Sequence, residues 1–440
     1  MIRRLVILYF CAGLAGPVSA AAQTPLSLAE AIARARTNNV GARLAAAGER
    51  EAVPRVDQAR SAYYPRVDVS ESWQLGNQPV FVFGSLLAQR QFTAQNFAID
   101  ALNHPDPVDN FRTSITVEQP LYNGSTGPAV KSAEIGRDLA AISRTLTDQE
   151  LALVVTEAYG RVHMAAATRQ SVESTIAAAA ADRDLAAQRR DAGRATDADV
   201  LLLDVQLARG RQQAIRAASD EEVARARLNQ AIGEPLDAVF VFEPVQPVAG
   251  PTRDAATLET EALGARLEVR ASALQAQLAQ TTVSSARAAF LPQVSTQLGW
   301  EMNGGQWDSR SPSWIVGVVA SVNLFRGFAD RARLAEAEAQ VSRRALEREQ
   351  VETAVRLEVR VATARLEAAR ASVAVGRAAV EQARESQRIV RDRYEAGLMD
   401  VTALLRAGEA VLQAETQQTV SAVELVMAGA ALDRAVGQSR

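Results

Sequence analysis

Apolar residues recur three and four positions apart along two long stretches of the chain, which is the spacing of an amphipathic helix. The pattern covers about 128–232 and returns over about 328–436. Each stretch is interrupted once, at Gly193 and at Gly397, where the chain can turn because glycine accepts positive φ. The sequence therefore predicts two long helical hairpins. Their helices are too long for a compact domain and must pack along other helices.

Four shorter segments alternate between apolar and polar residues with period two, which is the pattern of strands with one apolar face. They lie at about 65–75, 111–121, 292–302 and 314–324, and each is about as long as a tilted strand that crosses a bilayer. Strands of soluble proteins can alternate in the same way, so the interpretation as membrane strands depends on there being four such segments in one chain. Aromatic residues in or beside the segments predict an interfacial girdle. These residues are Tyr63, Tyr64, Trp73, Phe290, Trp300, Trp314 and Phe325.

Several motifs occur twice, in the same order. The matching pairs are 59–67 with 286–294, 121–124 with 324–327, and 231–233 with 435–437. Matches in three separate places predict a tandem duplication, with a first repeat at 23–250 and a second at 251–440. Each repeat is expected to begin with one helix, followed by two strands and the helical hairpin. Prolines and glycines at 244–251 mark the linker between the repeats. The first copy carries extra residues between Trp73 and Phe111, which predict a long surface loop.

Four strands cannot close a barrel, and an open strand edge is not tolerated in lipid, so the chain is expected to share strands with copies of itself. Two chains would supply eight strands, whose interior side chains fill completely. Three chains would supply twelve and leave room for an aqueous lumen, which is favoured if the polar faces line it. The predicted fold class is mainly α with a small β part. It combines tandem-duplicated helical hairpins, in a coiled-coil α-barrel, with four antiparallel strands that contribute to a trimeric twelve-stranded outer-membrane β-barrel.

The first 22 residues have the features of a cleaved export signal. A basic start at Arg3 and Arg4 precedes a short apolar core, and small residues follow up to Ala22, with cleavage expected after Ala20 or Ala22. A lipoprotein anchored at Cys11 is disfavoured, because bulky residues precede that cysteine. The chain is therefore predicted to be exported, and beyond the signal no uninterrupted apolar stretch is as long as a membrane-spanning helix.

Composition and charge disfavour several other functions. The 48 basic and 51 acidic residues leave a formal charge of −3, so no basic field attracts nucleic acid. His104 and His163 lack a second histidine at metal-binding spacing. We expect His104 to lie in a turn or an external loop, and His163 to pack between helices or to be solvated. Neighbouring acids such as Asp182 and Asp184 are expected to be solvated or to cap helices. We predict no enzyme, no catalytic residue, no cofactor and no metal site.

Some of these motifs resemble the TolC family of outer-membrane efflux ducts, over nearly the whole mature chain. The residues that carry the resemblance are the start at 26–31 with Asn38-Asn39, the strand entries at Pro65 and Pro292, the strand exits at 119–124 and 324–327, and Tyr394-Glu395-Ala396-Gly397 at a hairpin tip. The resemblance implies a homotrimer in the lipid of the outer membrane of a Gram-negative bacterium, with a helical tunnel extending into the periplasm. It also implies a periplasmic adaptor and an inner-membrane pump as partners, and no nucleic acid.

The resemblance also suggests roles for the two hairpin tips. Docking of the adaptor is expected around Gly193-Arg194 and Gly397-Leu398. The periplasmic aperture is expected near four residues, which are Asp199, Asp400, Ala403 and Arg406. Some family members carry an acidic Asp-Val-Leu-Asp segment at the aperture. The corresponding residues of this chain are Ala403-Leu404-Leu405-Arg406, and this departure puts an acidic ring at that position in doubt.

The sequence thus favours a passive trimeric exit duct of a tripartite system for small molecules, powered by its partner pump. Two alternatives stay open. One is an exit duct for type I protein secretion. The other is a soluble periplasmic coiled-coil scaffold or adaptor, which would explain the helices but would give the four alternating segments no role.

Overall fold

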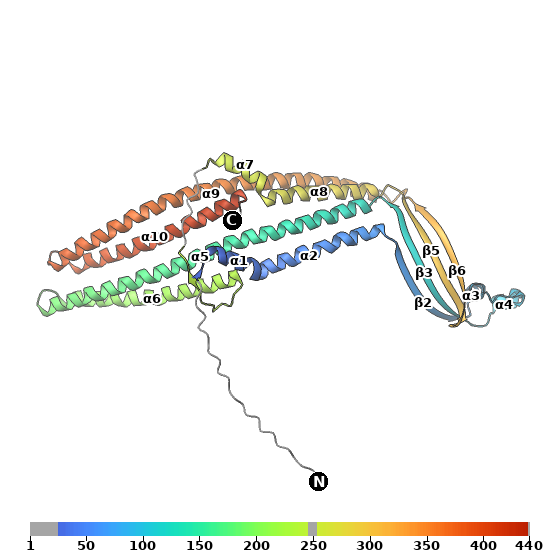
Figure 1. The fold of residues 1–440 in the computed structure, drawn as a ribbon, viewed down its shortest axis with the longest axis horizontal. Helices are drawn as coiled ribbons and strands as arrows, with labels where there is room; N and C mark the ends of the chain where they lie inside the picture. Colours follow the sequence, from blue (N-terminus) through green and yellow to red (C-terminus); the bar gives the residue numbers. More distant parts are fainter. Residues whose placement is uncertain (1–24, 245–252, 439–440) are drawn as a thin grey trace, which may run out of the picture.

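The computed structural model describes residues 25–244 and 253–438. The expected signal at 1–22 and the linker beyond Pro244 lie outside these residues. Figure 1 shows an elongated molecule in which long helices occupy most of the length and a curved sheet forms one end. The helices lie along one another, as their length requires.

Each half of the chain contributes two shorter helices, two long strands and a hairpin of two long helices. In the first half these are α1 (Leu28–Asn38), α2 (Val40–Arg60), β2 (Arg66–Gly76), β3 (Val108–Asn123), α5 (Thr126–Asp191) and α6 (Asp197–Ile232). In the second half they are α7 (Ala255–Ala265), α8 (Leu267–Ala288), β5 (Gln293–Gln306), β6 (Ser309–Ser321), α9 (Ala329–Glu395) and α10 (Val401–Val436). The mainly helical fold class with a few antiparallel strands is confirmed.

Three details differ from the expectation. The single helix expected before the first strand of each half is split in two, at Asn39 and at Arg266, where the backbone is extended. The last strand, expected at 314–324, occupies Ser309–Ser321, so Phe325 lies beyond it. The expected surface loop of the first half is partly helical, with α3 (Pro79–Ala88) and α4 (Ile99–Asn103). Because α3 is apolar on nearly every side, its sequence carries no helical period to reveal it.

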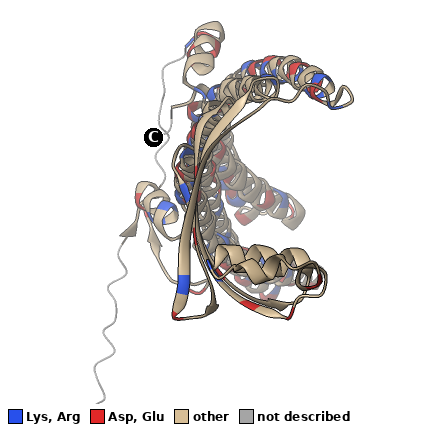
Figure 2. Ribbon diagram, turned by 90° about the vertical axis from the view of Figure 1, so that its right-hand side faces the viewer, with Lys and Arg blue, Asp and Glu red and all other residues tan. Residues whose placement is uncertain are grey.

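The four long strands form one antiparallel sheet in the order β2-β3-β5-β6. A bulge between Pro120 and Tyr122 lets β3 keep its pairing with β5 after proline removes a ladder donor. Figure 2, which views the molecule from its sheet end, shows that the sheet is curved. Two short strands, β1 (Pro25–Leu26) and β4 (Val241–Phe242), pair in parallel beside the helices.

The middle of the molecule contains the largest apolar cluster among the described residues, and Tyr159 lies at its centre. Its hydroxyl lies 2.8 Å from the carbonyl oxygens of both Leu26 and Glu243, so α5 fastens β1 and the chain after β4 in place. Burial raises the pKa of Tyr159 to about 12, which keeps this hydroxyl a donor at any physiological pH. The ring of His163 packs 4.9 Å from that of Tyr159, and burial lowers its pKa. In the structure, His163 packs against neighbouring aromatic rings, which is the helix-packing role.

The two halves end in similar junctions. The return helices α6 and α10 both stop at a glycine in the left-handed conformation, Gly233 and Gly437. In the first half, Asn39 Nδ2 donates to the carbonyl oxygen of Ala231 at 2.9 Å. In the second half, Arg266 Nη1 donates to the carbonyl oxygen of Ala435 at 3.2 Å. Each hairpin is thus fastened at its base to the point where the shorter helices of its own half meet.

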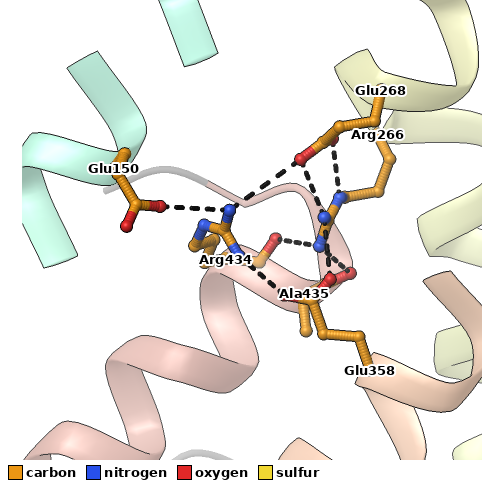
Figure 3. A network of polar contacts seen from close by, with 6 residues as sticks. All are labelled: Glu150, Arg266, Glu268, Glu358, Arg434 and Ala435. Carbon is orange, nitrogen blue, oxygen red and sulfur yellow. Dashed lines mark hydrogen bonds and ion pairs between the residues drawn. The ribbon is translucent and has the colours of Figure 1, made fainter. Parts of the chain in front are cut away.

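Around Arg266 the second junction carries a polar network (Figure 3). The guanidinium of Arg266, 5% exposed, pairs with Glu268 and Glu358 at 2.8 Å each. Arg434 reaches Glu358 at 2.7 Å and Glu150 of α5 at 3.2 Å, which connects the second half to the first. Burial alone would raise the pKa of Glu268. The hydrogen bonds from Arg266, a backbone hydrogen bond and the charges of Arg266 and Arg434 together outweigh burial and hold this pKa below its usual range.

None of the helices in the described part of the chain is both long enough and apolar enough to cross a membrane.

Candidate functional site

The pairing register gives the sheet one apolar face and one polar face. Residues directly opposite one another in an antiparallel sheet point to the same side. Val69 pairs with Ile115, Ile115 with Trp300, and Trp300 with Trp314, so most apolar residues of the four strands share one face. These side chains are largely exposed although they are apolar, with Val69 68% and Trp314 74% exposed. Such a surface fits contact with lipid, because a chain in water rarely leaves so large an apolar patch uncovered.

The opposite face of the sheet is polar. Ser70 and Ser114, on β2 and β3, share a hydrogen bond of 2.7 Å. Arg112 on β3 forms an ion pair with Glu301 on β5 at 2.7 Å. Arg66 pairs with Asp68 on the same strand, also at 2.7 Å. Hydroxyl groups and charged side chains of both signs therefore make up most of this face, with Ile315 and Val319 of β6 as apolar exceptions, and such a lining favours water over lipid.

The residues expected to form an aromatic girdle fall at three levels of the sheet. Tyr63, Tyr64, Phe290 and Phe325 lie beside the ends of strands that face the helices. Trp73 lies near the opposite end, where its indole Nε1 donates to Asp109 at 2.8 Å. Trp300 and Trp314 are directly opposite each other on β5 and β6, midway along the strands. Four of the seven residues thus group at the end of the sheet that faces the helices, and the girdle stays a prediction for all seven.

At the other end of the molecule, both hairpins turn through a glycine in the left-handed conformation. Gly193 has φ +69° and Gly397 has φ +76°, values that other residues adopt only with strain. The residues that follow, Arg194 and Leu398, are exposed, Leu398 to 77%. The structure therefore presents the expected docking residues at the surface of both turns, and their docking role stays a prediction.

The acids expected near the aperture act as helix caps. The carboxylate of Asp199 accepts hydrogen bonds from the backbone N–H and the hydroxyl of Thr196, each at 2.9 Å. That of Asp400 accepts from the backbone N–H of Ala403 at 2.9 Å. Arg406 is exposed one turn further along α10. The four residues lie in the first turns of α6 and α10, and their role at an aperture stays a prediction.

Sequence reasoning missed a set of contacts that ties the two hairpins to each other close to their tips. Arg189 of α5 donates to the backbone carbonyl of Tyr394 on α9 and stacks over its ring, 4.8 Å from the centroid. Arg391 of α9 pairs with Asp182 of α5 at 3.1 Å. Below them an apolar cluster joins both hairpins, with Leu203 from α6 and Leu404 from α10. Since the partners are about two hundred residues apart in the chain, no local pattern announces these pairs.

Tyr394 is the centre of this arrangement. It is 4% exposed, and its hydroxyl has no hydrogen-bond partner within the described part of the chain. Burial raises the pKa of Tyr394, so the hydroxyl remains protonated. The recognisable Tyr-Glu-Ala-Gly motif thus places an aromatic ring between the hairpins, and the glycine makes the turn that follows.

Comparison with known proteins gives consistent results. Residues 31–234 and 258–438 match the family described as outer membrane efflux protein. The chain is 28% identical over 423 residues to Protein CyaE of Bordetella pertussis, covering 94% of this chain and 84% of that protein. It superposes on the outer-membrane channel OprN with a TM-score of 0.78 at 22% identity, covering 94% of this chain and 90% of the other. For the Campylobacter jejuni CmeC outer membrane channel the TM-score is 0.80 at 16% identity, covering 94% and 87%.

Proposed function

Because the chain belongs to the outer membrane efflux protein family, we propose that three copies of it form a passive duct through which small molecules leave the cell. Its place is the outer membrane, as for that family. The duct supplies a path and no energy. A pump of the inner membrane drives the export, a periplasmic adaptor joins the pump to the duct, and the helices of the duct extend into the periplasm to meet them.

The two-faced sheet with unpaired outer edges is the observation that carries this proposal. Within the described residues, β2 and β6 each pair on one side only. An open edge leaves backbone N–H and C=O groups unsatisfied, and in lipid each such group costs several kcal/mol. Pairing of β6 in one copy with β2 in the next removes both edges. Three copies of four strands then close a barrel with the apolar faces outside and the polar faces around a lumen.

The hairpins continue the duct below the sheet. Helices α5 and α9 have 66 and 67 residues and span about 100 Å at 1.5 Å per residue. With two hairpins from each of three chains, the helices form a tube in which every hairpin has a neighbour on both sides. The matched lengths bring the turns of both hairpins to the same level, where an adaptor meets them as one ring.

The mass of the protein tests the duct itself. Protein extracted from purified outer membranes is expected to have the mass of three chains in light scattering, after the detergent is subtracted. A monomer in the outer membrane, or protein recovered only from the periplasmic fraction, would refute the shared barrel. The second outcome would favour the coiled-coil scaffold.

The contacts between the tips suggest how the duct opens. Separation of the hairpins must break the Arg391–Asp182 pair and move Tyr394 from beneath Arg189. We expect Arg391→Ala to raise the conductance of the purified protein in planar bilayers about twofold or more, because one restraint on each chain is lost. Arg388→Ala serves as the matched control, since Arg388 pairs only with Glu385 and Asp392 of its own helix among the described contacts. Equal conductance of both variants would reject this role for the tip contacts.

The class of substrate separates efflux from protein secretion. Deletion of the chain in its native host is expected to raise sensitivity to small toxic compounds and to leave the exported proteins of the culture medium unchanged. Loss of one exported protein with unchanged sensitivity would instead assign the duct to type I secretion.

A further inference from the structure

The connection between β2 and β3 differs from its counterpart between β5 and β6. In the second half, the strands join through a tight turn in which Gln306 pairs with Ser309. In the first half, the residues from Pro79 to Ile99 include α3 and a short helical turn, and we call 79–99 the apolar segment. Its only charged residue is Arg90, although an ordinary surface loop would be rich in charge.

Buried amide groups fix the apolar segment to the polar face of the sheet. Gln89, 4% exposed, donates to the carbonyl oxygen of Asp109 at 2.7 Å and to Asn110 Oδ1 at 3.1 Å. Asn110 in turn donates to Asn303 at 3.0 Å. Asn303 pairs with Arg112, so this network lies on the polar face, and in the proposed barrel that face lines the lumen.

Figure 2 agrees with this placement, because helical chain lies on the concave side of the curved sheet at the end nearest the viewer. The ring of Phe81 supports it as well, since it lies where a side chain at Gly76 would point, 3.4 Å from an added Cβ. Gly76 is in phase with Gln74 on the polar face of β2. The first residues of the apolar segment therefore lie at the mouth of the proposed lumen, on the side of the sheet that faces away from lipid.

The apolar segment has a defined structure of its own. The rings of Phe83 and Phe92 meet edge to face with centroids 4.8 Å apart, and Phe92 and Phe97 do so at 5.0 Å. Yet apolar side chains remain uncovered in the single chain, with Val80 86%, Ile99 78% and Phe97 65% exposed. A small structured element with this much exposed apolar surface is expected to have a partner.

We propose that this partner is the same segment of the other two copies, and that the three apolar segments meet across the far mouth of the duct and close it. The proposal rests on the trimeric barrel proposed above. Lipid is the wrong occupant because the segment is fixed to the lumen side. Rotation about a threefold axis brings identical residues together at that axis, so an inward-facing element meets its own copies. An apolar constriction excludes water and ions without a charged gate, and cargo moving outward separates the segments.

Single cysteines test the contact directly. In full-length protein carrying Cys11→Ser, Val80→Cys and Ile99→Cys are each placed in the apolar segment, and cells are treated with copper phenanthroline. We expect disulfide-linked dimers of the chain for at least one of the two variants on a non-reducing gel. Asp308→Cys, which is exposed in the turn between β5 and β6, is the matched control and is expected to stay monomeric on the same gel.

Conductance tests the closure. Replacement of Val80, Phe97 and Ile99 by serine keeps the Gln89 anchor and removes the apolar contacts. Because the hairpin tips stay closed in series with the mouth, we expect the conductance of the purified trimer to rise about 1.5-fold with this variant alone and further when it is combined with Arg391→Ala. Cells with the variant should also admit large hydrophilic antibiotics from outside while still exporting small compounds.

The outcomes separate this inference from the proposed function. A particle of three chains with export intact, no cross-link at either position and unchanged conductance would overturn the closure and leave the duct standing. A monomeric particle would overturn both. Cross-linking of the apolar segment to a different protein, without cross-links between copies, would reject its own copies as the partner.

Discussion

The two halves of the chain use different chemistry to solve the same geometric problem. Each must fasten the base of a return helix to the point where two shorter helices meet. The first half uses a neutral amide, because Asn39 donates to Ala231 and also caps α2 by accepting from Gly41 at 2.7 Å. The second half uses Arg266 with two carboxylates. The contact lies at the same place in both halves and differs in its chemistry.

The difference teaches where each half is vulnerable. Removal of the amide leaves a neutral carbonyl without its donor. Removal of the arginine leaves two partly buried carboxylates with Arg434 as their one remaining counter-charge among the described contacts. The cost of the second loss is larger. The glycines at the helix ends show the opposite asymmetry, since the first half is the more tightly packed of the two at that point.

Replacement of Arg266 by methionine should have the largest effect. It leaves Glu268 and Glu358 short of a donor and should lower the free energy of unfolding by about 3–5 kcal/mol. Asn39→Ala, the matched change in the first half, should cost about 2 kcal/mol, because it removes both the bond to Ala231 and the cap of α2. Thermal unfolding of the purified protein, followed by the helical circular dichroism signal, measures both. Equal losses of unfolding free energy in the two variants would mean that the charged network stabilises its junction no more than the neutral amide does.

Alanine at the two helix-ending glycines should reverse the order of the halves. At Gly233 an added Cβ would lie 2.6 Å from the backbone carbon of Asn38, whereas at Gly437 the nearest atom is the Cβ of Ala265 at 3.1 Å. Both positions also force a non-glycine residue into the left-handed region. We expect a loss of about 3 kcal/mol for Gly233→Ala and about 1 kcal/mol for Gly437→Ala. The same unfolding measurement decides, and a larger loss at Gly437 would contradict this account.

The pH dependence of the second junction follows from Glu268. Its pKa in the folded chain is lower than the ordinary value of 4.5, so the stability it contributes is present above about pH 4.5 and is lost as pH falls through the folded-state pKa. Glu268→Gln should therefore lower the melting temperature near neutral pH and should match the original chain in strong acid. A difference that persists in acid would show that the glutamine acts through packing instead.

Charge reversal at the first hairpin tip should affect stability least. Arg194 is exposed, so Arg194→Glu is expected to change the free energy of unfolding by less than about 0.5 kcal/mol. If the tip meets an adaptor, export should nevertheless fall. Arg216→Glu, at an exposed position within α6, is the control for a general effect of charge. Unchanged export of every tested compound would remove the tip of the first hairpin from the docking surface.

Local pattern was sufficient to predict the hairpins, the turns at Gly193 and Gly397, and the two-faced strands, because each depends on residues close together in the chain. It failed where the tertiary structure decides. The breaks at Asn39 and Arg266 lie within otherwise helical sequence, and the extended backbone there is held by contacts with distant carbonyl groups. The helix α3 was missed because a segment that is apolar all round shows no period.

The candidate site was predictable to a similar extent. The exposed residues at the tips follow from the turns, whereas the contact of Arg189 with Tyr394 depends on how two hairpins pack and has no signature in either one. The sharing of one apolar face by all four strands needed the register, since alternation within each strand fixes its own faces but not their alignment with the next strand.

The return helices also have a mechanical consequence. α6 and α10 each contain 36 residues between the glycine at the base and the turn at the tip, so each is a lever arm of about 54 Å. A rotation of about 5° at the base would displace a tip by about 5 Å over that length. Because the two arms are equal, the same small rotation at both pivots carries the tips through equal arcs. In the proposed trimer, six tips would then widen as a ring without tilting, although the pivots beneath them differ in chemistry.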